Sequence, residues 1–131
     1  MQKIQKTDTE WRAELDPKAY EILRLQGTER PGTGELLHNK AQGEYVCGGC
    51  GVTLFASDTK FDSGSGWPSF TDPANREHVT LITDGSHGIT RTEVRCAACD
   101  GHLGHVFPDG PGESGERYCI NSCALEFRPA E

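Results

Sequence analysis

Two Cys-x-x-Cys pairs constrain the fold of this chain more strongly than any other feature of its sequence. The pairs are Cys47-Gly-Gly-Cys50 and Cys96-Ala-Ala-Cys99, and 45 residues (51–95) lie between them. Two such pairs predict a site in which four thiolates bind one zinc ion, each pair forming a tight turn at the end of a strand. Four protein ligands leave no open coordination position, so we expect a structural zinc that joins two distant strand ends. Iron accepts the same ligands, and the sequence does not separate the two metals.

Two other interpretations of the cysteines are less favoured. A redox-active Cys-x-x-Cys usually occurs as one pair beside a βαβ pattern, which this sequence lacks. A mixed site of two cysteines and two histidines within residues 96–105 would leave Cys47 and Cys50 without a role. The six cysteines in 131 residues are also sparser than the roughly 8–10% typical of disulfide scaffolds. The pattern therefore predicts one metal ion and leaves Cys119 and Cys123 for other roles.

The overall composition narrows the classes of function. The chain carries a formal net charge of −7, which argues against nucleic-acid binding because phosphates require a basic surface. The first residues, MQKIQKTDTEW, do not form a basic and then apolar leader, and no apolar run approaches the length of a membrane span. We therefore expect a cytoplasmic protein of one domain, residues 1–131, with neither nucleic acid nor a membrane as a partner.

The N-terminal third predicts a helical arm followed by a loop, residues 1–43. Thr7 and Glu10 have the spacing of a capping box. Asp16 and Pro17 predict the start of a second helix, which should continue to residue 25 and end at Gly27. Residues 29–42 contain Pro, Gly and Asn without a sustained period and predict a surface loop. The apolar side chains expected on the buried face of the second helix are Ala19, Tyr20 and Leu23.

Residues 44–128 favour β structure. The segment 84–88 predicts the turn of a hairpin between two of the strands. Together these features indicate a mainly antiparallel β core, joined by the metal site and carrying an N-terminal helical extension. The predicted strands cover residues 44–46, 52–55, 78–83, 89–95, 102–107 and 117–127.

Three short segments contain residue types suited to catalysis. In a strand, Arg117, Cys119 and Asn121 share one face, and a neighbouring cation favours the reactive thiolate. Two histidines, His102 and His105, follow the second cysteine pair and can supply a proton to a leaving oxygen. Such a polar strand face can be merely solvated, and a lone histidine is usually structural. The aromatic cluster Phe61, Trp67, Pro68 and Phe70 belongs to the core by default, but a tryptophan in a Gly/Ser/Pro loop also suits the wall of a small apolar pocket.

These segments and the two cysteine pairs closely resemble the B-type methionine-R-sulfoxide reductases. The matching segments are Gly-Trp-Pro-Ser-Phe (66–70), Gly-His-Leu-Gly-His-Val-Phe (101–107) and Arg-Tyr-Cys-Ile-Asn-Ser (117–122). The resemblance covers about residues 8–128 with the motifs in the same order. It implies a fold of two antiparallel sheets with a zinc site, and the reduction of methionine-R-sulfoxide to methionine.

The resemblance also implies a role for each motif residue. Cys119 matches the nucleophile that attacks the sulfoxide sulfur and becomes a sulfenic acid. His102 and His105 match the residues that bind and protonate the sulfoxide oxygen, Asn121 matches a polar partner, and Arg117 matches the residue that lowers the thiol pKa. Two aromatic residues, Trp67 and Phe107, would hold the S-methyl group.

One position departs from the family pattern. Many members carry a resolving cysteine where this chain has Ser65, and a hydroxyl cannot form a disulfide. The remaining thiol, Cys123, lies four residues from Cys119, or roughly 13 Å along a straight strand, whereas a disulfide needs Cα atoms within about 7 Å. Either the chain bends sharply after Ser122, or Cys123 is a small packed side chain, which we favour. We therefore expect thioredoxin or another external thiol to regenerate the enzyme, in the repair of proteins damaged by oxidative stress.

The alternative function is a non-catalytic, zinc-ribbon-like module that binds a protein or small ligand in a cleft at Trp67. Proteins with metal-stapled β folds do such work, and a fold alone does not select a function. A binding module has no need for a reactive cysteine close to His102 and His105, so these three residues separate the two interpretations.

Overall fold

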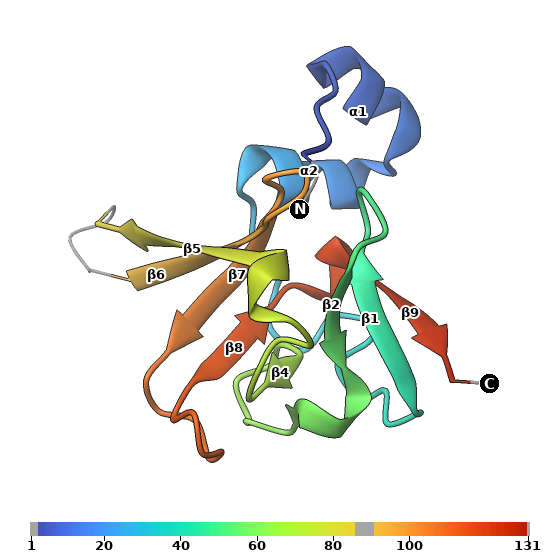
Figure 1. The fold of residues 1–131 in the computed structure, drawn as a ribbon. Coiled ribbons are helices and arrows are strands. Elements are labelled where there is room, and N and C mark those ends of the chain that lie inside the picture. Colours follow the sequence, from blue (N-terminus) through green and yellow to red (C-terminus); the bar gives the residue numbers. More distant parts are fainter. Residues whose placement is uncertain (1–2, 86–90, 131) are drawn as a thin grey trace.

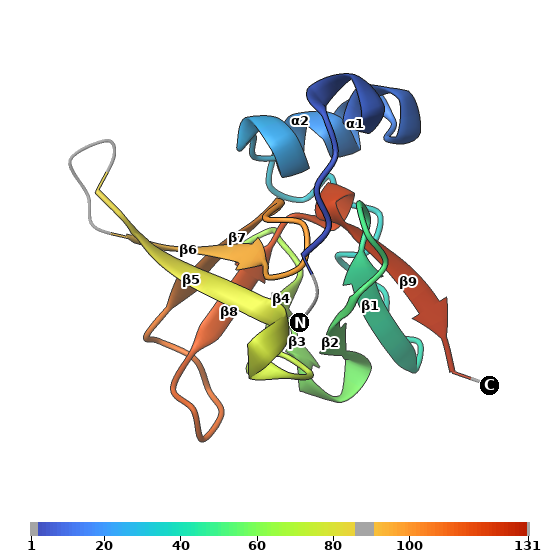
Figure 2. The same cartoon turned by 45° about the horizontal axis from the view of Figure 1, so that its top comes forward.

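The β part of the protein consists of two antiparallel sheets with two helices packed over one end (Figures 1 and 2). The computed structural model describes residues 3–85 and 91–130, and these residues form the sheets and helices. The smaller sheet has the strand order β2-β1-β9, and the larger one has the order β3-β4-β8-β7-β6-β5. This arrangement confirms the predicted mainly β fold of two antiparallel sheets with an N-terminal helical extension.

Most strands lie where the sequence predicts them. The turn expected at 84–88 and the start of the strand expected at 89 fall largely on residues 86–90, which lie outside the described residues. The flanking strands nevertheless pair in antiparallel register from Val79 with Cys96 to Asp84 with Arg91. The strands are β1 (Gly43–Cys47), β2 (Thr53–Ala56), β3 (Lys60–Phe61), β4 (Ser69–Phe70), β5 (Val79–Asp84), β6 (Arg91–Cys96), β7 (His102–Phe107), β8 (Arg117–Ile120) and β9 (Leu125–Pro129).

The two helices begin at the predicted caps. In α1 (Asp8–Glu14), Thr7 and Glu10 form the capping box through reciprocal hydrogen bonds of 3.2 and 3.0 Å. In α2 (Pro17–Leu25), the side chain of Asp16 accepts a hydrogen bond from the first turn. The helix continues to Leu25 as predicted, but the residue that terminates it is Gln26 rather than Gly27, because Gln26 adopts the left-handed conformation with φ 57°. Both helices are too short to cross a membrane, as judged over the described chain.

The predicted strand 117–127 is wrong as a single element. The chain leaves the larger sheet after Ile120, forms the short 3₁₀ helix η4 (Ser122–Ala124), and enters the smaller sheet as β9. Polar side chains hold this crossing: Asn121 bonds to two other segments, and Ser122 Oγ accepts the amide of Leu36 at 2.9 Å. The alternating apolar residues do not indicate this break, because side chains are buried in the core on both sides of it.

Aromatic side chains fill the space between the sheets. Phe55 and Phe70 stack with ring centroids 4.4 Å apart, and Tyr45 meets Phe70 at 5.1 Å. Tyr118 of β8 is also fully buried there. The predicted face of α2, formed by Ala19, Tyr20 and Leu23, is buried as expected. Strand β8 is therefore fixed from its inner side, which leaves its outer side to form a site.

Candidate active site

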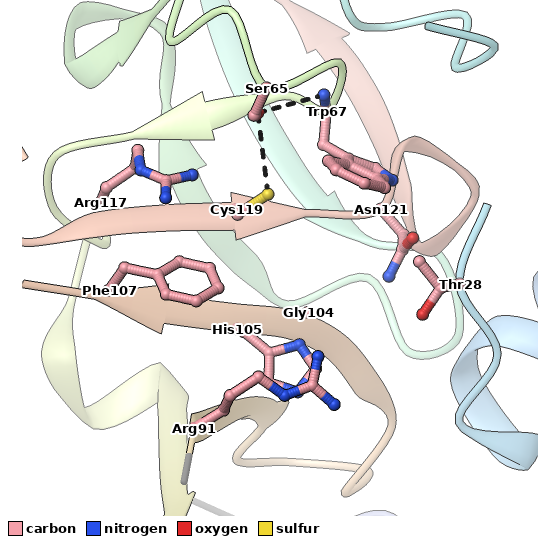
Figure 3. A pocket seen from close by; sticks show the side chains of 10 residues that line it. All are labelled: Thr28, Ser65, Trp67, Arg91, Gly104, His105, Phe107, Arg117, Cys119 and Asn121. Carbon is pink, nitrogen blue, oxygen red and sulfur yellow. Dashed lines mark hydrogen bonds between the residues drawn. The ribbon is translucent and has the colours of Figure 1, made fainter. Parts of the chain in front are cut away.

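A cavity of ≈ 250 Å³ opens on the outer face of β7 and β8 (Figure 3). It gathers most of the motif residues, although they come from separate parts of the chain. Of the seven proposed catalytic and substrate-binding residues, His102 is the one that does not line it. The lining residues are Thr28, Ser65, Trp67, Arg91, Gly104, His105, Phe107, Arg117, Cys119 and Asn121.

Strand alternation directs the cysteine into this cavity. Arg117 and Cys119 are partly exposed on the cavity side, whereas Tyr118 and Ile120 are fully buried in the core. Directly opposite Cys119, across the β7–β8 pair, lies His105. Side chains that face each other across antiparallel strands have Cβ atoms about 4.5–5.5 Å apart, so the imidazole lies within reach of the thiol.

A β-bulge places both motif histidines on one face of β7. In a regular strand, residues three apart point to opposite faces. The register between β6 and β7 shifts between Val94 and Arg95, and Leu103 is the extra residue on β7. Leu103 is fully buried in the core, while the rings of His102 and His105 meet edge to face with centroids 5.6 Å apart. The bulge thus converts a spacing that separates two side chains into one that brings them together.

His102 lies behind His105 and is anchored by a carboxylate. Its Nδ1 lies 2.7 Å from Oε2 of Glu93 on β6, and both residues are buried. Burial raises the pKa of Glu93, but hydrogen bonds from Arg95 and His102 outweigh this, so the pKa lies below its usual value. The carboxylate is therefore ionised and accepts the proton of His102 Nδ1.

The amide of Asn121 organises the rim of the cavity. Its Nδ2 donates to the carbonyl of the bulged residue Leu103 at 3.0 Å, and its Oδ1 accepts the backbone N–H of Glu29 at 3.0 Å. The carbonyl of Glu29 in turn accepts Trp67 Nε1 at 3.0 Å. The indole wall, the loop after α2 and the end of β8 are thereby tied to one another, and Thr28 is brought to the cavity.

The thiol of Cys119 has a raised pKa. Burial is the main cause, opposed by a hydrogen-bond contact with Ser65 Oγ at 3.9 Å and by the positive charge of Arg117. The guanidinium of Arg117 pairs with Asp109 at 2.9 Å and lies over the ring of Phe107, 4.6 Å from its centroid. Arg117 therefore lowers the pKa of Cys119, as expected, but burial raises it more. The surroundings as a whole favour the thiol over the thiolate.

The second spare cysteine lies away from this cavity. Cys123 is half-buried in η4, and its backbone N–H donates to Glu29 Oε1 at 2.9 Å. Burial and the carboxylate of Glu29 raise the pKa of Cys123 to about 11. The chain does bend after Ser122, which the straight-strand distance ignored, and Cys123 packs against the edge of the hydrophobic core.

Two cavity residues, Thr28 and Arg91, were not among the residues predicted from the sequence. No local pattern distinguishes Thr28, which reaches the site through the path of its loop. Arg91 had a usable signal, because Arg91, Glu93 and Arg95 alternate along a strand that pairs with β7. Alternate residues of a strand share a face, so this charged face could have been assigned to the histidine side.

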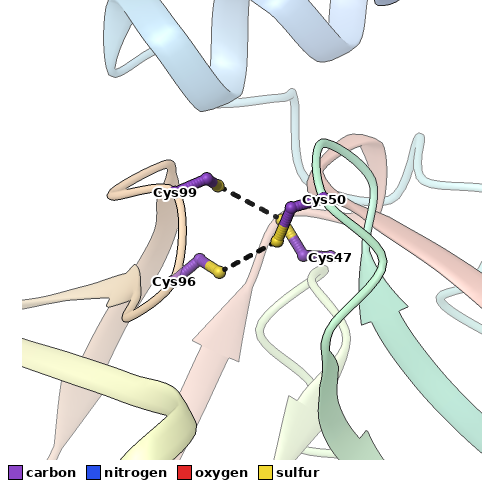
Figure 4. Close-up of side chains that lie close together, drawn as sticks. All are labelled: Cys47, Cys50, Cys96 and Cys99. Carbon is purple, nitrogen blue, oxygen red and sulfur yellow. Dashed lines mark hydrogen bonds between the residues drawn. The ribbon is translucent and has the colours of Figure 1, made fainter. Parts of the chain in front are cut away.

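The four cysteines of the two pairs converge at one end of the sheets, beneath the helices (Figure 4). Their sulfur atoms all lie within 4.8 Å of one another, with Cys47 and Cys99 at 3.7 Å and Cys50 and Cys96 at 3.5 Å. A zinc ion with four thiolates at about 2.3 Å requires neighbouring sulfurs roughly 3.8 Å apart. These residues can hold one metal ion, and the donor set fits zinc.

Comparison with known proteins identifies relatives along almost the whole chain. The SelR domain matches residues 15–129. A peptide methionine sulfoxide reductase MsrB of Bradyrhizobium diazoefficiens is 60% identical over 127 residues, covering 97% of this chain and 91% of the relative. Proteins of the same name from Thiobacillus denitrificans (126 residues, 96% of each chain) and Pseudomonas putida strain W619 (131 residues, 100% of this chain and 98% of the relative) are both 57% identical.

Proposed function

Because the chain belongs to the B-type methionine sulfoxide reductases and is an oxidoreductase of methionine-R-sulfoxide, we propose that Cys119 is its nucleophile and His105 its proton donor. The observation that carries the proposal is the register of β7 and β8, which sets these two residues opposite each other in the cavity. Family membership also favours the enzyme over the non-catalytic binding module.

The reaction needs a nucleophilic sulfur and a proton for the sulfoxide oxygen. The sulfur of Cys119 attacks the sulfoxide sulfur and forms an S–S bond, while the S–O bond of the protonated sulfoxide breaks. The released hydroxide, or a water molecule, then attacks the sulfur of Cys119, the S–S bond breaks, and methionine leaves as a thioether. The oxygen is then on Cys119 as a sulfenic acid, so the cysteine sulfur supplies both electrons. Since the raised pKa keeps Cys119 protonated at rest, its proton can pass through His105 to the sulfoxide oxygen. One proton transfer then activates the nucleophile and the leaving oxygen together.

The other cavity residues would bind and align the substrate. Trp67 and Phe107 offer apolar surfaces for the S-methyl group, and Arg117 and Ser65 stabilise the thiolate as it forms. Asn121 acts by holding the bulge of β7 and the loop at Glu29 in place. We assign the cysteine cluster to a structural zinc, which joins the ends of β1 and β6 and takes no part in the reaction.

An external thiol is proposed to regenerate Cys119. The hydroxyl of Ser65 lies 3.9 Å from its sulfur but cannot form a disulfide, and Cys123 is not part of the cavity. A dithiol of the thioredoxin class would attack the sulfenic acid, release water and form a mixed disulfide, which its second thiol then resolves. This requirement, and six cysteines of which none is in a disulfide, fit a cytoplasmic enzyme that repairs oxidised proteins under oxidative stress.

The test is a thioredoxin-coupled assay with the separate R and S epimers of a methionine sulfoxide peptide. The natural chain should consume NADPH with the R epimer alone. Cys119→Ser should have no activity, whereas the matched variant Cys123→Ser should keep most of it. Activity in Cys119→Ser, or a disulfide between Cys119 and Cys123 after one turnover without reductant, would contradict the proposal.

A further inference from the structure

The carboxylate of Glu93 is buried beside the cavity and strongly hydrogen-bonded, and the proposed reaction gives it no role. It is 4% exposed, and a single oxygen, Oε2, is approached by three donors. His102 Nδ1 lies at 2.7 Å, Arg95 Nε at 3.0 Å and Gln26 Nε2 at 3.5 Å. The shortest of the three contacts is therefore with the imidazole.

Glu93 also lies directly opposite His105 in the β6–β7 register. Side chains paired in this way project from the same face, so the carboxylate lies with His102 and His105 on one face of the larger sheet. Glu93 holds one nitrogen of His102, whose ring meets that of His105 edge to face. The three side chains form a continuous row from a buried anion to the cavity.

The hydrogen bond fixes the tautomer of His102. An ionised carboxylate can only accept, so Nδ1 carries the proton, and this tautomer has its lone pair at Nε2. Nε2 is buried and has no hydrogen-bond partner among residues 3–85 and 91–130. Buried polar groups are usually hydrogen-bonded, so this nitrogen is a candidate acceptor beside the ring of His105.

We propose that Glu93 is a positioning residue for the reductase reaction: its carboxylate fixes the tautomer and ring orientation of His102, and His102 in turn orients the proton donor His105. This inference rests on the proposed function of His105. A carboxylate that holds a histidine in one tautomer plays the same part in other acid–base sites, where its loss affects the chemical step more than binding.

An ion pair with Arg95 alone does not account for this arrangement. The side chain of Arg95 is 29% exposed, so the pair could form at the surface without burying the carboxylate. Burying an anion is costly unless its hydrogen bonds are satisfied, and the donor that is itself buried is His102. The position of Glu93 is thus set by the imidazole rather than by the guanidinium.

The first test uses the natural chain in its metal-bound form. Nitrogen-15 NMR of histidine-labelled protein, with the His102 signals assigned from a His102→Gln variant, should show the proton on Nδ1 at neutral pH. A proton on Nε2 alone would overturn the proposal. This measurement does not depend on turnover, so it separates failure of the inference from failure of the proposed function.

The second test compares Glu93→Gln with Glu44→Gln, a control at an exposed carboxylate on β1. Glu93→Gln should slow the single-turnover reduction about 10- to 100-fold with KM changed less than about twofold, and should alter the His102 nitrogen shifts. Glu44→Gln should change neither. Equal losses in Glu93→Gln and Arg95→Gln, or a natural rate in Glu93→Gln, would overturn the positioning role. If Glu93→Gln does not fold, the NMR result on the natural chain decides.

Discussion

Gly104→Ala should lower both stability and activity, because β7 and β8 approach closely at this residue. A Cβ atom at position 104 would lie 2.1 Å from the carbonyl oxygen of Cys119 and 3.0 Å from Cα of Ile120. Ordinary van der Waals contact begins at 3.4 Å, so the methyl group and the carbonyl must separate by roughly 1.3 Å. Both obstructing atoms belong to the backbone and cannot move away by changing rotamer.

The size of the effect follows from this geometry. Overpacking typically costs about 1–3 kcal/mol, and a clash with backbone on a central strand belongs at or above the upper end. With a urea m-value of about 2 kcal/mol/M, a loss of about 3 kcal/mol lowers the unfolding midpoint by roughly 1.5 M. The strand separation also moves Cys119 away from its partner His105, and a displacement of about 1 Å can reduce turnover about 100-fold.

The assay combines urea unfolding with single-turnover reduction of the R epimer. Gly85→Ala is the matched control, because a Cβ atom there meets none of the described residues within 4 Å. The control should behave as the natural chain does. If Gly104→Ala keeps the natural midpoint and turns over within about twofold of the natural rate, the close approach of the two strands does not position Cys119.

Three further outcomes are expected. Ser65→Cys places a thiol where the hydroxyl lies 3.9 Å from the sulfur of Cys119. One turnover without reductant should therefore remove two free thiols, counted by alkylation and mass spectrometry, whereas loss of only one thiol, as expected for the natural chain, refutes this. Removing the metal with a chelator, or the substitution Cys47→Ser, should lower the melting temperature by at least about 10 °C in parallel with zinc content, because the metal then no longer joins β1 to β6. An unchanged melting temperature contradicts the structural role. Stability should fall as the pH rises from about 9 to about 12, because folding raises the pKa of Cys123 to about 11 and that of Tyr118 to about 12. The unfolded chain therefore releases these protons at a lower pH than the folded chain does, and equal urea midpoints at about pH 8 and pH 10.5 would refute this.

Features encoded in local spacing were predictable from the sequence. The Cys-x-x-Cys pairs predicted a metal site, and the cysteines do converge. The caps at Thr7 and Asp16 predicted both helix starts, and alternation along β8 predicted that Arg117 and Cys119 share a face. The caps and the alternation depend on residues within a few positions of one another, where backbone geometry alone relates sequence to structure. Each cysteine pair is equally local, and the preference of zinc for four thiolates relates the two pairs across the 45 residues between them.

Features that depend on contacts between distant segments were not predictable from the sequence. The strand expected to continue through residue 127 breaks at η4, because Asn121 and Ser122 bond to loops far away in the sequence. The bulge at Leu103 brings His102 and His105 together, although their spacing in a regular strand would separate them.

The environment of the reactive groups was likewise decided by the tertiary structure. The sequence has a cation, Arg117, two residues from Cys119, and this cation lowers the pKa of the thiol. Burial raises the pKa by more, so the net shift is upward. No sequence pattern indicated that Glu93 bonds to His102. Residue types and their periodicity can be read directly from the sequence. Burial and the partner of each charge depend on which segments fold against each other, and these determine the pKa of a thiol or a carboxylate.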